Sequence, residues 1–185
     1  MQDYRININY AKALMQLAAE TGEQEQVSAD MRLVHQVCAE NRELNAVFDN
    51  PQIKAGKKAG ILTELFGEHV CKTTREFLLF VVRKKRSVNL KGISAMYLDL
   101  YRESRGIVLS HLTTAHPVDE DTQVLAAKTI ADFTHKQVEL QTHVDPAVLG
   151  GLAMEFDGYM FDATVAARLA KLRRRFEENV YESKL

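Results

Sequence analysis

The segment from residue 138 to residue 176 carries the clearest local signals in the chain and most constrains its fold. From Val138 to Val144, apolar or β-branched side chains alternate with polar ones, which predicts a strand with one buried face. Asp145-Pro146 follows, and proline cannot donate a hydrogen bond to a sheet. The strand is therefore expected to end at this dipeptide.

The remainder of the segment predicts a turn, a hairpin and a helix. Gly150-Gly151 provides backbone freedom, and Asp157-Gly158 is a dipeptide that favours a tight hairpin with positive φ. Asp162 is placed to cap a final helix. An apolar stripe runs along that helix, formed by Val165, Leu169, Leu172 and Phe176. Its other faces are mostly basic, with Arg168, Lys171, Arg173, Arg174 and Arg175. The segment specifies architecture and carries no catalytic constellation.

Six stretches before residue 106 have apolar side chains at helical spacing. They run from Ile6, with Asn7 or Asn9 near the start, to a stop at Gly22, from Gln24 to Glu40, from Leu44 to Asn50-Pro51, from Ile53 to Phe66, from Thr73 to Arg83, and from a Ser87 cap to Gly106. The run from Phe77 to Val82 is apolar on every face, so a buried strand is the alternative there. Capping-box spacing between Thr73 and Glu76 favours the helix.

After Gly106 the pattern changes to that of a mixed domain. A strand is expected from Ile107 to Thr114, followed by a helix that Asp119 or Asp121 opens. The apolar face of that helix is predicted to contain Val124, Ala127, Ile130 and Ala131. We therefore predict a mainly α chain, with a six-helix bundle domain over residues 1–105 and a small α+β domain over residues 106–185.

Composition excludes several classes of protein. The 24 Lys and Arg residues nearly balance the 25 Asp and Glu residues, so no global charge favours nucleic acid or an anionic membrane. Cys38 and Cys71 lie far apart, which predicts neither a zinc site nor a disulfide framework and fits a reducing compartment. Met1 to Arg5 show no secretory signal pattern, and no apolar run is long enough to span a membrane.

Possible functional residues are each matched by a structural explanation. The basic groups at 83–86 and 168–175 lack interleaved aromatic residues, so solvated helix faces are favoured over nucleic-acid contacts. His111 and His116 lack metal-ligand context, and Gly150-Gly151 lacks a phosphate-loop pattern. No catalytic, cofactor-binding or metal site is predicted. The first and fifth predicted helices could form a groove for a partner's amphipathic helix, although core packing also explains their apolar residues.

In this order and spacing, the segments are similar to one known family. The matching pieces are Tyr10 to Leu14, Asn41 to Pro51, Lys57 to Phe66, Phe77 to Arg86, Val144 to Gly151, and Asp162 to Leu169. Together they resemble the delta subunit of the bacterial F-type ATP synthase, the counterpart of the mitochondrial oligomycin-sensitivity-conferring protein. The resemblance spans nearly the whole chain.

The resemblance implies a non-catalytic stator subunit in the peripheral stalk. Such a subunit links the amino termini of the alpha subunits, on the catalytic head, to the carboxy-terminal region of the b-subunit stalk, and it resists torque during proton-driven ATP synthesis. It implies one copy per complex, bound peripherally at the cytoplasmic face of the bacterial cell membrane, with no cofactor, nucleic acid or direct membrane insertion. The alternative function is a stand-alone helical adaptor or a nucleic-acid-binding module that uses the basic helix faces.

By the same resemblance, the alpha-subunit helix is expected to bind between the first and fifth helices. The implied contact residues are Tyr10, Ala13, Leu14, Phe77 and Phe80. Two departures from the family pattern stand out. Ala163 replaces a frequent glycine before the last helix, and Lys84-Lys85 replaces a small polar residue and a glycine before Arg86. The added lysines are expected to alter the contact surface.

Overall fold

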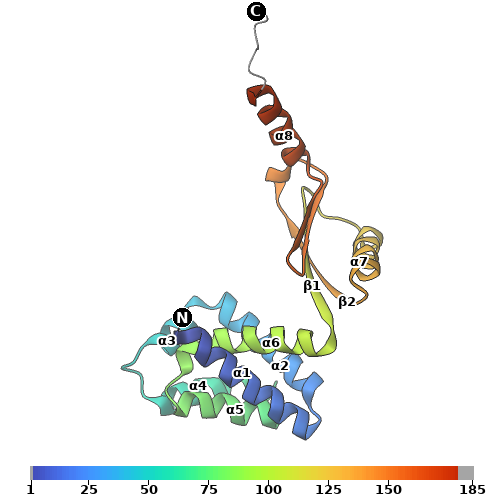
Figure 1. Cartoon of the computed structure of the whole chain (residues 1–185). Coiled ribbons are helices and arrows are strands. Elements are labelled where there is room, and N and C mark those ends of the chain that lie inside the picture. The colour runs from blue at the N-terminus through green and yellow to red at the C-terminus, as the bar shows by residue number, and fades with distance from the viewer. Residues whose placement is uncertain (1, 179–185) are drawn as a thin grey trace, which may run out of the picture. The chain divides into compact units, whose positions relative to one another are not determined.

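The structure, a computed structural model, describes residues 2–178. It is mainly helical, and the predicted helical bundle followed by a small α+β part is confirmed. The chain divides between Ser104 and Arg105 into two compact units, drawn in Figure 1. Whether these units are independent domains, as the boundary after residue 105 predicts, stays a prediction.

Six α-helices and one 3₁₀ turn build the N-terminal unit. They are α1 (Gln2–Thr21), α2 (Gln24–Glu40), α3 (Arg42–Asp49), α4 (Ala55–Phe66), α5 (Lys72–Arg83), η1 (Ser87–Asn89) and α6 (Leu90–Arg105). The prediction that placed Asn7 or Asn9 near the start of the first helix is wrong, because α1 already begins at Gln2. The apolar run from Phe77 to Val82 is helical and lies within α5, so the strand alternative is also wrong.

A single apolar core joins these helices. Every α-helix of the unit contributes to it, with Leu14, Met31, Phe48, Phe66, Val81 and Tyr97 each at most 2% exposed. One close contact between two helices requires a glycine. A Cβ atom at Gly92 of α6 would lie 2.1 Å from Asn7 Nδ2, so glycine lets α1 pack directly against α6.

Several polar groups form hydrogen bonds between different helices of the bundle. The backbone N–H of Cys71, at the start of α5, donates to Asp30 Oδ2 of α2 at 2.8 Å. Thr73 Oγ1 donates to Glu23 Oε2 at 2.6 Å, so the predicted capping box of Thr73 with Glu76 is wrong. Ser87 likewise does not cap α6, because its hydroxyl donates to the Phe48 carbonyl at 2.8 Å. The hydroxyls of Thr73 and Ser87 therefore bond to distant residues and do not cap their own helices.

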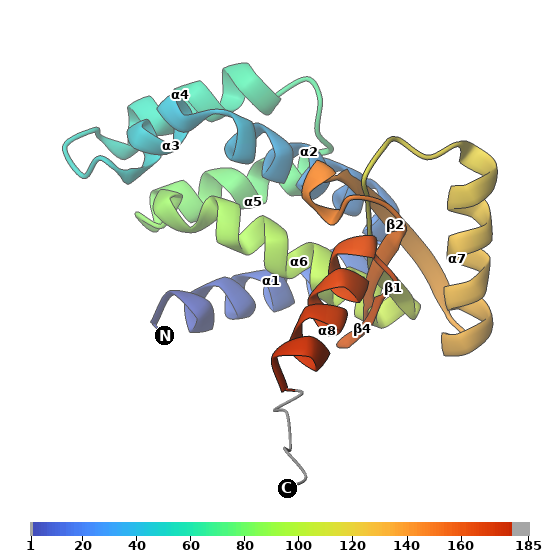
Figure 2. The same cartoon turned by 90° about the horizontal axis from the view of Figure 1, so that it is seen from above.

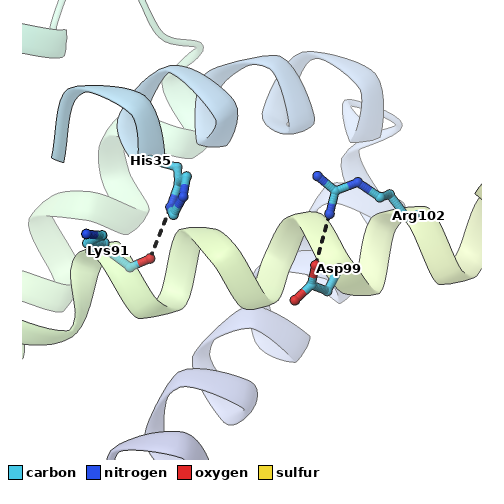
Figure 3. Close-up of polar contacts among 4 residues, drawn as sticks. All are labelled: His35, Lys91, Asp99 and Arg102. Carbon is cyan, nitrogen blue, oxygen red and sulfur yellow. Dashed lines mark hydrogen bonds and ion pairs between the residues drawn. The ribbon is translucent and has the colours of Figure 1, made fainter. Parts of the chain in front are cut away.

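Helices α2 and α6 also meet through a histidine. Figure 3 shows His35 Nδ1 facing the Lys91 carbonyl oxygen, 3.4 Å away, and the same nitrogen lies 3.3 Å from Ser94 Oγ. The ion pair in that figure, Arg102 with Asp99 at 2.9 Å, joins neighbouring turns of α6. Because the Asp99 side chain is 58% exposed, we expect that pair to add less than about 1 kcal/mol.

Burial of two weak acids makes the bundle sensitive to alkaline pH. Desolvation raises the pKa of Cys38 to about 11 and that of Tyr97 to about 12. The unfolded chain loses the Cys38 proton near the ordinary pKa of 9.0, whereas the folded chain keeps it up to about pH 11. The folded state is therefore favoured fully below pH 9, and this contribution to the free energy of unfolding is lost as pH rises through about 11. We expect the free energy of unfolding, measured with urea, to fall in this range. Cys38→Val should reduce the slope by at most about 1.4 kcal/mol per pH unit.

The C-terminal unit is a four-stranded sheet with two helices. Its elements are β1 (Ile107–Thr114), α7 (Glu120–Thr134), β2 (Gln137–Val144), η2 (Pro146–Val148), β3 (Leu152–Phe156), β4 (Tyr159–Asp162) and α8 (Val165–Glu178). The strand order is β2-β1-β3-β4. Strands β1 and β2 are parallel, joined by the α7 crossover, and the other two pairings are antiparallel. Figure 2 shows α7 beside β1 and β2.

Helix α7 buries only part of its apolar surface. Ile130 packs with Val108 and Phe156 in the small core of this unit. The predicted face is wrong at Val124, which is 67% exposed, whereas Ala126, one turn before Ile130, is buried. The strand prediction for β2 is confirmed, but its far end is not buried, since Val144 is 42% exposed. Val144 is the last residue of β2, and β2 is an edge strand of the sheet.

The hairpin and the final helix follow the predicted order. Asp157 and Gly158 have φ of 46° and 78°, as a tight β3–β4 turn requires. The cap of α8 differs from the prediction. Thr164 Oγ1 accepts a hydrogen bond from Ala167 N at 3.1 Å, while Asp162 Oδ1 accepts from Thr164 N at 2.9 Å. Thr164 is therefore the cap, and Asp162 orders the preceding turn, where the bonds from Thr164 lower its pKa.

Candidate partner-binding groove

A hollow of about 670 Å³ lies between α1 and α5. Six residues of α1 and three of α5 line it: Asn9, Tyr10, Ala13, Gln16, Leu17, Glu20, Glu76, Phe77 and Phe80. We call this hollow the α1–α5 groove. The volume lies within the range of ordinary ligand sites, but the groove is open along the two helices.

Two apolar stripes on α1 explain how the helix serves the core and the groove together. Ala11, Leu14 and Ala18 are 0% exposed and face the interior. Tyr10 and Leu17, seven residues apart, lie on the adjacent face and line the groove. Leu17 is 40% exposed. Helix α1 therefore presents apolar surface that the bundle itself does not cover.

Aromatic side chains from both helices shape the groove. The Tyr10 ring centroid lies 6.5 Å from that of Phe77 and 6.3 Å from that of Phe80, with interplanar angles of 66° and 48°. Phe77 is 7% exposed and forms the floor, whereas Phe80 is 46% exposed and forms a wall. These ring contacts, one edge-to-face and one tilted, hold the side chains in place and give the groove a preformed apolar surface.

Two acidic side chains line the groove, and one lysine lies beside its Phe80 wall. Glu20 and Glu76 line it, and Glu76 is 3.9 Å from Lys72 in an exposed pair that contributes little. The Lys84 ammonium lies 5.5 Å from the Phe80 ring centroid, in a cation–π contact. An occupant would therefore meet a mainly apolar surface whose only lining charges, among the described residues, are the two acidic residues Glu20 and Glu76.

The structure brings four of the five sequence-predicted contact residues to this groove. Tyr10, Ala13, Phe77 and Phe80 line it. Leu14 does not, because it is 0% exposed and belongs to the core. Sequence reasoning missed Leu17, although its spacing of seven from Tyr10 could have revealed it. Whether any of these residues contacts a partner stays a prediction.

The other candidate features form no comparable site in the part of the chain that the structure describes. Gly151 has φ of 74°, and a Cβ there would lie 2.5 Å from the Ala163 carbonyl oxygen, so Gly150-Gly151 is a close-packed turn. Basic residues of α8 are exposed, and Arg173 pairs with Glu177 at 2.8 Å. Within residues 2–178, no three His, Cys, Asp or Glu side chains are grouped to hold a metal ion. No helix in that range could span a bilayer.

Comparison with known proteins gives one consistent result. The family profile described as ATP synthase delta (OSCP) subunit matches residues 6–176. The ATP synthase subunit delta of Cytophaga hutchinsonii is 36% identical over 97% of this chain and 98% of its own length. That of Bacteroides fragilis is 35% identical, over 92% of this chain and 93% of its own. A chain of the Toxoplasma gondii mitochondrial ATP synthase hexamer shares the fold, with a TM-score of 0.73 at 19% identity over 94% and 98% of the two chains.

Proposed function

Because the chain belongs to the ATP synthase delta (OSCP) subunit family, we propose that it is a non-catalytic stator subunit of its synthase. In this role it connects the catalytic head to the peripheral stalk, so that the head does not turn with the central rotor. The apolar α1–α5 groove carries the proposal, since a connector needs a preformed surface on which a partner segment can dock.

We propose that the groove binds the amino-terminal helix of an alpha subunit. An amphipathic helix can lay apolar side chains on Tyr10, Leu17 and Phe80, all of which are at least partly accessible in the free protein. The acidic lining from Glu20 and Glu76 favours basic residues beside the apolar stripe of that helix. Apolar contact supplies most of the affinity, and the charges set orientation and association rate.

The C-terminal unit is proposed to bind the carboxy-terminal region of the b-subunit stalk. Helix α8 supports this role, because its apolar stripe packs against little of its own unit. Val165, Leu169, Leu172 and Phe176 are between 39% and 77% exposed. A contiguous exposed apolar stripe of this length usually marks a surface that binds another protein.

We also propose a stoichiometry and a location for the chain. One copy per complex fits a connector between one head and one stalk, positioned at the cytoplasmic face of the bacterial membrane through its partners. In this role the chain is proposed to bind neither a cofactor nor nucleic acid. The alternative adaptor function would require strongly salt-dependent RNA or DNA binding that is lost when Arg173, Arg174 and Arg175 are neutralised. Family membership favours the stator subunit over that alternative.

Reconstitution tests the function directly. We expect the purified chain to restore proton-driven ATP synthesis to membranes whose synthase has been depleted of this subunit. At equal concentration, Phe80→Asp should restore at most about a tenth of the ATP synthesis that the unmodified chain restores, because a buried, unpaired carboxylate weakens docking by about 2 kcal/mol or more.

Leu65→Asp is the matched control for that experiment. Leu65 of α4 is 43% exposed, close to the 46% of Phe80, and it does not line the groove. This variant should restore synthesis as the unmodified chain does. Equal synthesis with and without the added chain would contradict the proposed function.

A further inference from the structure

A buried lysine in the N-terminal unit is held by neutral hydrogen-bond acceptors. Lys58 of α4 is only 7% exposed, and its ammonium donates to the Phe48 carbonyl at 2.6 Å and to Ser87 Oγ at 3.1 Å. An ammonium has three hydrogens, so one remains for a further acceptor. Among residues 2–178, no carboxylate forms an ion pair with Lys58. Buried charges are usually paired, so this arrangement calls for an explanation.

Lys58 lines a second hollow, of about 400 Å³, on the side of the bundle where α3, α4 and α5 end or begin. The lining also includes Asp49, Pro51, Gln52, Ile53, Lys54, Ala55, Val82, Lys85, Ser87 and Val88. Three lysines and one acidic residue therefore surround a space large enough for a small ligand. We call it the lysine pocket.

The start of α4, where the first backbone amides have no intrahelical acceptor, lies at this pocket. Lys54 is the N-cap residue, and its side chain makes no capping hydrogen bond. Its carbonyl accepts from the N–H groups of Lys57 and Lys58. The amides of Ala55 and Gly56, in the first turn, have no intrahelical acceptor, and Ala55 lines the pocket. Free amides and the positive end of the helix dipole attract anions.

Lys85 occupies a backbone conformation that favours glycine. Its φ is 59°, and the bonds from Lys85 N to Val82 O at 2.9 Å and from Arg86 N to Val81 O at 3.1 Å form the Schellman ending of α5. A side chain at this position disfavours the folded state by a factor of roughly 5 to 30 relative to unstrained backbone. The chain nevertheless has a lysine here, and that lysine lines the pocket. Backbone strain of this kind is often retained where it serves a function.

We propose that the lysine pocket binds a small oxyanion of the phosphate class. The Lys58 ammonium, the first-turn amides of α4 and the flexible ammonium groups of Lys54 and Lys85 would supply its hydrogen-bond donors. An oxyanion offers several acceptor oxygens to these donors at once, which a halide ion does not. The apolar wall of Ile53, Val82 and Val88 limits competition from water. This site is separate from the α1–α5 groove, so it does not depend on the stator proposal.

Titration of the full chain with inorganic phosphate, followed by amide NMR, tests the site. We expect saturable shifts at Ala55, Gly56 and Ser87 that sodium chloride of equal ionic strength does not reproduce. Lys85→Gly should weaken phosphate binding about tenfold, because one cation is lost. The same variant should raise the melting temperature without phosphate by about 2–6 °C, because strain is relieved.

Two further variants make the result decisive. Lys57→Ala removes the same charge from an exposed α4 position that does not line the pocket, and it should bind phosphate as the unmodified chain does. Lys58→Met should abolish the saturable shifts. Shifts that do not saturate, that chloride reproduces, or that Lys57→Ala and Lys85→Gly reduce equally would overturn the proposal and indicate a solvated pocket.

Discussion

Ala13→Asp is expected to weaken binding of the alpha-subunit amino-terminal helix at least about 100-fold. Ala13 is exposed in the free protein and lines the α1–α5 groove, so the new carboxylate is solvated until the partner docks. Docking would then bury an unpaired charge in the apolar part of the groove, at a cost of about 3 kcal/mol or more. Titration calorimetry with a synthetic peptide of the alpha subunit from the same synthase measures the change.

The matched control is Ala19→Asp. Ala19 is also exposed on α1 but does not line the groove, so both variants carry the same added charge and a similar loss of helix propensity. We expect Ala19→Asp to bind the peptide within about twofold of the unmodified chain. If both variants lose affinity equally, the effect comes from general charge or helix stability, and the groove is not the docking site.

Gly151→Ala is expected to destabilise the C-terminal unit by about 2–4 kcal/mol. Gly151 has φ of 74°, which a residue with a side chain adopts at a cost of about 1–2 kcal/mol. Its Cβ would also lie 2.5 Å from the Ala163 carbonyl oxygen and 3.2 Å from Thr164 Cα, so the backbone before α8 would have to move. The displacement would disturb the bond from Val165 N to the Gly150 carbonyl, now 2.9 Å, that holds the start of the helix.

Hydrogen exchange read residue by residue measures this effect. Amides of residues 107–178 should lose protection, while those of the bundle should keep theirs if the two units unfold separately. Gly158→Ala is the control, since Gly158 has φ of 78° with open space around its Cβ position and should cost only the strain. Equal losses for the two variants would show that the contact with Ala163 does not matter.

Local signals were sufficient for most of the fold. Asp157-Gly158 predicted the β3–β4 hairpin correctly, since both residues must adopt positive φ in so short a turn. Proline at 146 marked the end of β2. Each of these features is decided by a few adjacent residues, and for that reason the sequence alone reveals them.

Two of the predictions that failed concerned partners distant in sequence. Thr73 bonds to Glu23, fifty residues earlier, and Ser87 bonds to the Phe48 carbonyl, thirty-nine residues earlier. A capping box or cap residue is a local hypothesis, and a stronger tertiary partner displaces it. The buried state of Lys58 was invisible for the same reason, because its acceptors come from α3 and η1.

The groove was predicted in part. Helical spacing places Tyr10, Leu14 and Leu17 on neighbouring faces of α1, but it does not say which face the other helices cover. Packing of the bundle buries Leu14 completely and leaves Leu17 at 40% exposure. The departure at Lys85 was visible in sequence as an unusual residue, whereas its positive φ and its place in the lysine pocket required the structure.

The most direct test of the proposed stator function is binding of the full chain to the alpha-subunit amino-terminal helix of its own synthase. We predict saturable one-to-one binding with a negative heat-capacity change, as burial of apolar surface requires. Amide shifts should be concentrated at Tyr10, Ala13, Phe77 and Phe80, which line the groove. Absence of binding both to this peptide and to the assembled catalytic head would contradict the proposal.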